Sequence, residues 1–302
     1  MPTTNTAPIA AMAEGIRRRV LAHALRRDGG YVSQACSSAE ILACLFGGLL
    51  RLAPVEAPIR PPPFRGVARP GHPGASGRAV YGPPGPDLDR FFLSPTHYSL
   101  PLYAALIEAG RLHPDALDDY DRDGSSVEMI GAEHSPGMEV MTGSLGQGLG
   151  QALGIALGRR MKGENARTWV LLSDGELQIG MTWEGLQFAA HHRLDRVRIV
   201  VDVNGQQCDG TVDSVMGVEP AADRFEAFGA EVRVVDGHDV EALLAAGSAD
   251  PSPGRPLVVL ARTDPCRGLE LMRRNAPRLH YLRFRGAADR SDYDAALAAM
   301  DR

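Results

Sequence analysis

Apolar residues along this chain form two kinds of stretch, short strand-like runs and longer segments with helical spacing. The strand-like runs cover residues 169–172, 197–203, 231–236 and 256–261. Residues 197–203 alternate too little for a half-exposed strand and predict a strand buried in a parallel sheet. Residues 256–261 predict another buried strand, and residues 169–172 form a short apolar run before a turn. Apolar positions three and four residues apart predict helices over 9–27 and 183–192. The chain is therefore expected to belong to the α/β class.

The stretch from Trp169 to Gln206 combines a strand, a sharp turn, a helix and a second strand. A right-handed crossover makes two such strands parallel. Asp174 follows the first strand and Asn204 follows the second, so both are expected at the sheet edge where open parallel sheets bind ligands. A carboxylate, an amide oxygen and nearby backbone carbonyls suit a Mg²⁺ ion that carries a diphosphate. Taken singly, Asp174 and Asn204 are equally well explained as turn residues.

Three weaker patterns occur in the remaining sequence. Ser37 or Ser38 is expected to cap a helix that begins near Ala39. Residues 54–86 are crowded with proline and glycine, which predicts an insertion without regular structure. This insertion is either solvated or used as a partner-binding or entrance loop. Residues 291–302 predict at most a short helix.

A row of glycines, Gly146, Gly150, Gly154 and Gly158, recurs at four-residue spacing on one face of a predicted helix. Each glycine costs roughly 1 kcal/mol relative to alanine inside a helix. The spacing therefore predicts that a cofactor or another backbone approaches this face closely.

Composition limits the class of protein. The chain has 302 residues, of which 44% are hydrophobic and 23% charged, as in soluble globular proteins with a sizeable core. A net charge of −5 without a basic run argues against a nucleic-acid partner. The four cysteines form neither a close metal pair nor a disulfide framework, which favours a reducing, cytoplasmic setting. No signal peptide is visible at residues 1–8, and no apolar run is expected to span a membrane.

Several long motifs resemble those of the transketolase family. Around the Asp-Gly pair and the asparagine the sequence reads SDGELQIGMTWE and VVDVNGQQCDG, close to the family's thiamine diphosphate motif. Three further stretches are similar: PGMEVMTGSLGQGLGQALGIALGRR, DRFFLSPTHYSLPLYAAL and SSAEILACLF. The resemblance covers nearly the whole chain and implies a three-layer α/β/α fold with a mostly parallel sheet.

The resemblance also implies roles for individual residues. It places the metal ligands at the side chains of Asp174 and Asn204 and the carbonyl of Gln206. It implies catalytic roles for His97, His280 and Glu184, the last in an acidic chain between active sites. Besides Asp174, Asn204 and the two histidines, the cofactor-binding residues would be Gly143, Leu145, Gly146, Gly175 and Glu176. A histidine between a strand and a helix is often merely a capping residue, but the matching residues on either side of His97 favour the ligand role.

Other positions depart from the family pattern. Tyr31 and Met129 stand where the family has histidines, the first of which faces the substrate. A phenol cannot titrate near neutrality as an imidazole does, so substrate recognition or proton handling should differ. Ile179 replaces a glutamate of the acidic chain, and the stretch 263–268 lacks the family's lysines.

The resemblance extends only to the diphosphate-binding half of a full transketolase. Residues 1–302 are therefore expected to form a single domain, the N-terminal subunit of a two-component enzyme that depends on thiamine diphosphate and Mg²⁺. The enzyme would transfer a two-carbon ketol unit from a ketose or 2-oxo acid. A C-terminal, pyrimidine-binding subunit would complete it as an α2β2 heterotetramer. Two alternatives are a noncatalytic or regulatory cofactor-binding subunit and another acyl-transferring or decarboxylating enzyme that uses thiamine diphosphate.

Overall fold

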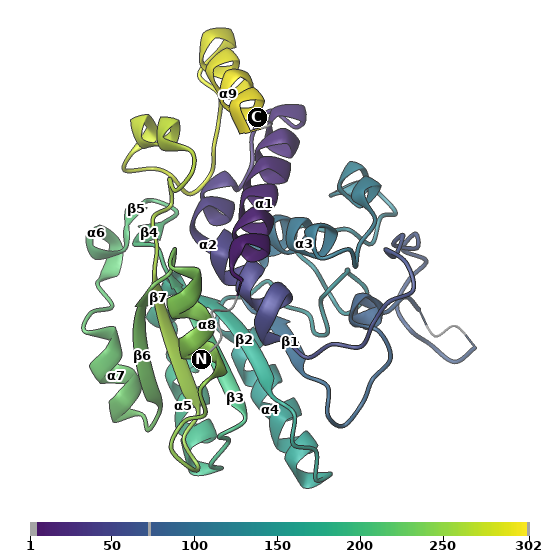
Figure 1. Cartoon of the computed structure of the whole chain (residues 1–302), viewed down its shortest axis with the longest axis vertical. Coiled ribbons are helices and arrows are strands. Elements are labelled where there is room, and N and C mark those ends of the chain that lie inside the picture. Colours follow the sequence, from purple (N-terminus) through teal and green to yellow (C-terminus); the bar gives the residue numbers. More distant parts are fainter. Residues whose placement is uncertain (1–4, 72–73, 301–302) are drawn as a thin grey trace.

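A parallel sheet of five strands forms the centre of the computed structural model, which describes residues 5–71 and 74–300 (Figure 1). Its order is β1-β2-β3-β7-β6, and each strand runs parallel to its neighbours. The strands are β1 (Arg90–Leu93), β2 (Thr168–Ser173), β3 (Val197–Val203), β6 (Glu231–Asp236) and β7 (Leu257–Arg262). The strands predicted at 197–203 and 231–236 occur with those bounds, and the other two are shifted by a residue or extended at their ends.

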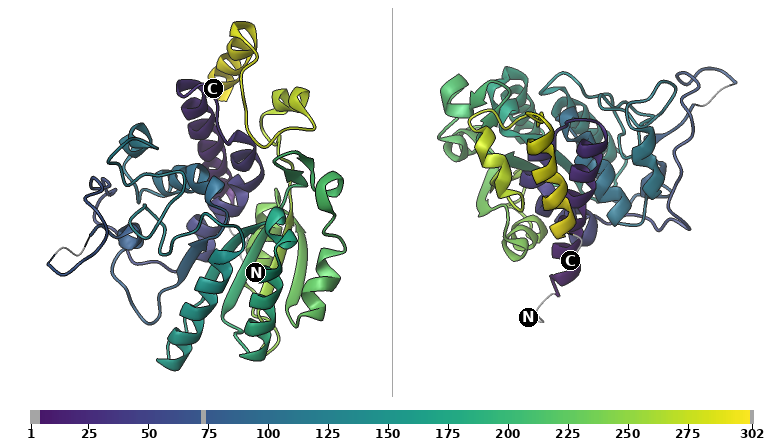
Figure 2. Two further views of the ribbon diagram at one scale, coloured as in Figure 1. Left: turned by 180° about the vertical axis from the view of Figure 1, so that it is seen from behind. Right: turned by 90° about the horizontal axis from the view of Figure 1, so that it is seen from above.

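Helices cover both faces of this sheet, so the predicted three-layer α/β/α fold is confirmed (Figure 2). The strand residues alternate between two separate cores: Trp169 and Leu171 of β2 pack into one, and Val170 and Leu172 into the other. The first core contains α1 (Ala7–Arg26), α2 (Val32–Cys44), α3 (Ser99–Glu108) and α8 (Val240–Ser248). The second contains α4 (Gln147–Met161), α5 (Gly180–His191) and α7 (Ala221–Ala227).

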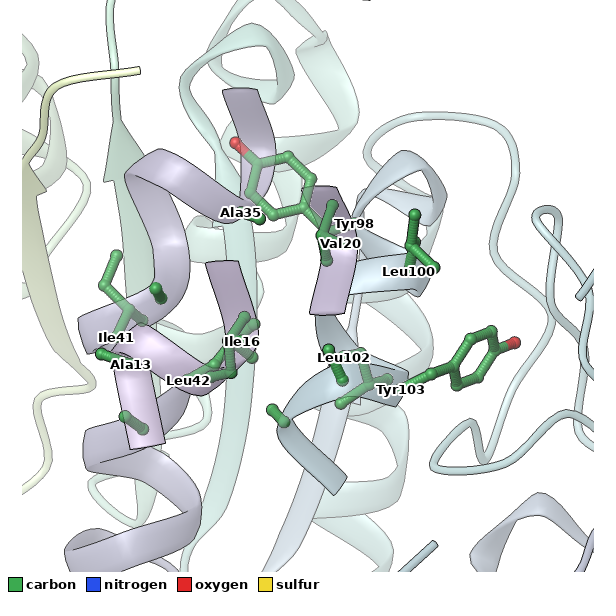
Figure 3. Close-up of a cluster of buried hydrophobic side chains, with 14 of the residues drawn as sticks. Ala13, Ile16, Val20, Ala35, Ile41, Leu42, Tyr98, Leu100, Leu102 and Tyr103 are labelled. Carbon is green, nitrogen blue, oxygen red and sulfur yellow. The ribbon is translucent and has the colours of Figure 1, made fainter. Parts of the chain in front are cut away.

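The first core is built around α1 and α2. Ile16 and Val20 of α1 lie near Leu42 of α2 and Leu102 of α3, and all four are fully buried (Figure 3). One stretch of the described chain, Val32–Leu49, is long and apolar enough to cross a membrane by length and composition, contrary to expectation. Since 83% of it is buried inside the protein, it is a core helix.

The helix predicted to begin near Ala39 begins at Val32 instead, so the expected serine caps are wrong. Both serines lie inside α2 and use their hydroxyls elsewhere. Ser38 donates to the carbonyl of Gln34 at 2.6 Å, and Ser37 donates to Asp202 in the sheet. Burial of the whole helix outweighs the preference of serine for helix ends.

The proline- and glycine-rich insertion is largely irregular where it is described, apart from a 3-10 turn at Gly77–Tyr81. It extends from the β1 side of the sheet (Figure 1). Residues 72–73 of this insertion and residues 301–302 lie outside the described part of the chain. The C-terminal helix, α9 (Ala287–Met300), has 14 residues and packs on α1, so it is longer than predicted. That residues 1–302 form a single domain stays a prediction.

The glycine row on α4 has no close neighbour within the described chain. A Cβ placed on Gly150, Gly154 or Gly158 would have no atom within 4 Å. No backbone of the described chain therefore approaches this face closely, and approach by a cofactor or another chain stays a prediction. Gly146 is different, because it precedes α4 with φ +84° and a Cβ there would lie 2.8 Å from Ile179 Cγ2.

Candidate active site

A cavity of about 260 Å³ opens at the carboxyl edge of β2 and β3, the edge where the sequence predicted a ligand. The pairing of Ser173 with Asp202 sets the register, so Asp174 and Asn204 both emerge beside this cavity. Eight of the predicted site residues line it: His97, Gly143, Leu145, Asp174, Gly175, Asn204, Gln206 and His280. The other three, Gly146, Glu176 and Glu184, do not.

The Asp174–Asn204 pair is fixed by backbone and side-chain hydrogen bonds. Asp174 Oδ2 accepts from the amide of Gly205 at 2.7 Å, and Asn204 Oδ1 accepts from the amide of Gln206 at 2.8 Å. Burial, with the neighbouring carboxylate of Asp202, raises the pKa of Asp174 to about 8. No lysine or arginine lines the described cavity, so a cation at this place would stabilise the ionised form of Asp174.

The sequence did not identify Asp202 as a site residue, although its carboxylate accepts hydrogen bonds from side chains beneath the cavity. It is fully buried in β3, and the pKa of its carboxyl is raised by that burial. Its oxygens accept from four side chains: Ser37 Oγ, Tyr98 Oη, Asn204 Nδ2 and Thr263 Oγ1. Tyr98 Oη donates at 2.7 Å and in turn accepts from Asn204 Nδ2 at 2.8 Å. One feature of the sequence could have identified Asp202: it is an acidic residue inside a mostly apolar strand, two positions before Asn204.

Aromatic rings form the opposite wall of the cavity. The ring centroids of His97 and His280 are 5.0 Å apart, and that of Tyr31 lies 6.0 Å from His97 and 5.5 Å from His280. Burial and the neighbouring His280 lower the pKa of His97 to about 3, and burial lowers that of His280. Both imidazoles are therefore neutral near pH 7 and act as hydrogen-bonding groups.

The segment that carries His280 is tied to the start of α2. Gln34 Nε2 donates to the carbonyl of His280 at 3.1 Å and lies 3.3 Å from His280 Nδ1. Gly30 and Leu282 exchange two backbone hydrogen bonds in an isolated bridge. These contacts hold the ring of His280 over the cavity, a position that the sequence motif alone could not show.

Glu176 lies beneath the cavity and links three segments. Its Oε1 accepts from Ser94 Oγ and from the amide of Gly146 at 2.9 Å, and its Oε2 accepts from the amide of Ser173 at 3.0 Å. This arrangement fixes the turn before α4 against the end of β2. Glu184, in contrast, is exposed on α5 and lies outside the cavity.

The donor set fits Mg²⁺ with a diphosphate. Within the described residues no group of three or more His, Cys, Asp or Glu side chains is placed so that it could hold a metal ion, so protein side chains alone would not hold Mg²⁺. Mg²⁺ ordinarily uses one or two carboxylates and completes its shell with water and phosphate oxygens. Gln206 Oε1, an atom of a cavity-lining residue, is buried without a hydrogen-bond partner, as expected where a ligand group is absent.

An open parallel sheet with a polar, metal-suited cavity at its carboxyl edge defines a cofactor-binding α/β protein. Comparison with known proteins narrows this class. Residues 82–269 match the family described as transketolase, thiamine diphosphate binding domain. The chain belongs to the transketolase family, a family of transferases, and this confirms the resemblance predicted from its motifs.

Individual relatives differ in length. The chain is 36% identical over 277 residues to y4mO of Sinorhizobium fredii, which is named a transketolase family protein, with 88% of each chain covered. It is 30% identical to the 6-deoxy-6-sulfo-D-fructose transketolase subunit SqwG of Clostridium sp., covering 83% of this chain and 82% of that protein. Human transketolase is 33% identical over 244 residues, but the match covers only 34% of its length.

The fold agrees with solved structures of the same family. Transketolase from Campylobacter jejuni superposes with a TM-score of 0.71 at 20% identity, covering 99% of this chain and 47% of that one. The chain thus spans about half the length of this solved relative, in the region that has the same three-layer fold.

Proposed function

We propose that this chain is the N-terminal, thiamine diphosphate-binding subunit of a two-component enzyme that transfers a two-carbon ketol unit. The single observation that supports it most is the cavity in which Asp174, Asn204, His97 and His280 meet at the β2–β3 edge. The match with this chain covers 82% or more of the length of three transketolase relatives, two of which are named as subunits. This agreement in length supports a two-component organisation.

The protein's own contribution is to bind and orient the cofactor. In the proposed complex Asp174, Asn204 and the carbonyl of Gln206 hold Mg²⁺, while His97, His280 and Gly175 contact the diphosphate. Gly143 and Leu145 line the thiamine side. When bound, thiamine diphosphate supplies the nucleophilic carbon that accepts and passes on the two-carbon unit. The ring nitrogens of His97 and His280 would donate hydrogen bonds to the diphosphate oxygens.

A partner subunit completes the proposed enzyme. It would bind the pyrimidine end of the cofactor, and two copies of each chain would form an α2β2 heterotetramer with active sites at the interfaces. The open glycine face from Gly150 to Gly158 offers a place where another backbone can approach closely. The setting we propose is cytoplasmic, in agreement with the free thiols of all four cysteines.

The test uses the chain with a transketolase-like C-terminal subunit, thiamine diphosphate and Mg²⁺. The expected result is ketol transfer by the pair and none by either chain alone, with a mass by light scattering that fits two copies of each. Asp174→Ala should abolish Mg²⁺-dependent cofactor binding by calorimetry, whereas Asp223→Ala, which removes an exposed carboxylate on α7, should not.

Three results contradict the proposal. Full turnover by the lone chain would show that no second subunit is needed. Cofactor binding without transfer by any pair would favour a noncatalytic, regulatory subunit, and decarboxylation of a 2-oxo acid without ketol transfer would favour a different enzyme that uses thiamine diphosphate.

A further inference from the structure

The proline- and glycine-rich insertion repeatedly contacts one other part of the chain. That part is residues 124–138, which we call the wall segment. Two backbone hydrogen bonds join it to separate places in the insertion. The amide of Phe64 donates to the carbonyl of Gly124 at 2.8 Å, and the amide of Gly77 donates to the carbonyl of Glu133 at 2.7 Å. The insertion is therefore fastened to the body of the protein and is not simply a solvated loop.

Side chains reinforce this attachment. The ring of Phe64 stacks on the ring of His134, with centroids 4.3 Å apart and an angle of 29° between the planes. His134 Nε2 lies 2.9 Å from a carboxylate oxygen of Glu128, farther along the wall segment. Tyr81, at the end of the 3-10 turn of the insertion, donates its hydroxyl to the carbonyl of Gly137. The insertion thus holds the wall segment by rings as well as by backbone.

Gly77 makes the closest approach between the two segments. A Cβ at this position would lie 1.9 Å from the carbonyl oxygen of Ser135 and 2.5 Å from that of Met138. Both neighbours are backbone atoms, which cannot turn aside as the end of a side chain can. The carbonyl of Gly77 also accepts from the amide of Gly137 at 2.8 Å. Glycine is therefore required here because the two backbones lie so close together.

The other side of the wall segment faces the cofactor cavity. Met129 and Ile130 line this cavity. Thr96 Oγ1 donates to the carbonyl of Met129 at 2.7 Å and accepts from the amide of Gly131 at 3.2 Å. Thr96 itself lines the cavity and directly precedes His97. Since the wall segment contacts the insertion on one side and the cavity on the other, displacement of the segment would move the cavity wall.

We propose that the insertion is a positioning element that holds Met129 and Ile130 in the wall of the cofactor cavity, with Phe64 and Gly77 as its positioning residues. This inference deepens the proposed function and rests on it for the identity of the ligands. A wall that is held by several contacts before binding needs less ordering when cofactor and substrate arrive. Met129 and Ile130 are apolar, so they act on these ligands chiefly through shape.

The central variant is Phe64→Ala, which removes the stacked ring and leaves the close approach at Gly77 intact. Hydrogen exchange measured on the full chain should become faster in residues 124–138 and stay unchanged in β2 and β3. On the reconstituted pair, donor KM should rise and calorimetric affinity for thiamine diphosphate with Mg²⁺ should fall by roughly two- to tenfold, the range for an aromatic pair. The kcat should change little, because the proposed metal and diphosphate contacts lie outside the wall segment.

Three variants serve as controls and one extends the test. Phe64→Tyr keeps the ring and should behave as the wild type. Val67→Ala is a matched apolar truncation at an exposed position of the same insertion and should change nothing. His134→Ala removes the other ring of the stack, so its combination with Phe64→Ala should add little to either change alone. Gly77→Ala should give a larger effect of the same kind as Phe64→Ala.

Three results would overturn the inference. Unchanged exchange in residues 124–138 of Phe64→Ala would show that the insertion does not hold the wall segment. Faster exchange with unchanged KM and cofactor affinity would show that the position of this segment does not matter to the ligands. Equally faster exchange in β2 and β3 would show that the insertion supports the fold as a whole.

The measurements keep this inference distinct from the proposed reaction. Hydrogen exchange needs neither substrate nor partner, and cofactor affinity needs no turnover, so both test the positioning role even if no ketol transfer is observed. Conversely, transfer by the Phe64→Ala pair with wild-type KM would refute the positioning role and leave the proposed function intact.

Discussion

Substitution of Asp202 by asparagine removes one negative charge beneath the candidate active site while keeping the shape of the side chain. Four donors converge on this buried carboxylate, from Ser37, Tyr98, Asn204 and Thr263. An amide has one acceptor oxygen, so at least one of these donors must turn away or lose its partner. We expect Asp202→Asn to weaken both the fold and the orientation of Asn204.

The magnitude follows from the kinds of hydrogen bond involved. Bonds to a charged acceptor contribute about 1.5–3 kcal/mol and neutral ones about 1 kcal/mol, so the substitution should cost roughly 1–3 kcal/mol of unfolding free energy. For a chain of this size that corresponds to a fall in Tm of about 2–6 °C. Loss of the Asn204 contact should weaken Mg²⁺-dependent binding of thiamine diphosphate about tenfold, although Asp202 does not line the cavity.

Calorimetric titration of thiamine diphosphate in the presence of Mg²⁺, together with thermal unfolding, measures both effects. Asp223→Asn is the control, because Asp223 is exposed on α7 and should change neither quantity. If Asp202→Asn binds the cofactor as tightly as the wild type, the carboxylate does not position Asn204 and the reasoning fails.

Three further predictions concern the same site. With a folded pKa near 8 against an ordinary 3.8, Asp174 binds a proton that Mg²⁺ must displace, so Mg²⁺-dependent cofactor affinity should rise with pH up to about 8 and then level off. Titrations in two buffers of different ionisation enthalpy should show proton release, and a pH-independent affinity would contradict it. Glu176→Gln should lower stability by about 1–3 kcal/mol and increase proteolysis of the turn before α4, because Glu176 accepts from Gly146 and Ser173; unchanged cleavage would contradict this. Tyr31→His should alter the donor specificity of the reconstituted pair without changing calorimetric affinity for the cofactor, and an unaltered ranking of donors would count against a substrate-facing Tyr31.

The sequence predicted the buried strands and the placement of Asp174 and Asn204 at one sheet edge, because both depend on local patterns. Continuous apolar runs mark β2, β3 and β7, and the parallel crossover necessarily brings Asp174 and Asn204 to one edge. The start of α2 was predicted wrongly because serines that favour helix ends are overridden by burial when their hydroxyls find partners such as Gln34 and Asp202.

The rest of the site depends on contacts between distant segments, which periodicity does not encode. The four donors to Asp202 come from α2, from the turn before α3, from β3's end and from the loop after β7. The position of His280 beside His97 depends on the Gly30–Leu282 bridge. The motif resemblance named these histidines, but only the fold shows that they share a wall with Tyr31.

The central claim is that the β2–β3 edge holds the metal and the diphosphate. The most direct measurement is a crystal structure of the reconstituted pair with thiamine diphosphate and Mn²⁺ in place of Mg²⁺, in which the metal is located by its anomalous scattering. The account predicts one anomalous peak within bonding distance of Asp174 and Asn204, with the diphosphate in the cavity beside His97 and His280. A peak elsewhere, or a diphosphate bound outside this cavity, would contradict it.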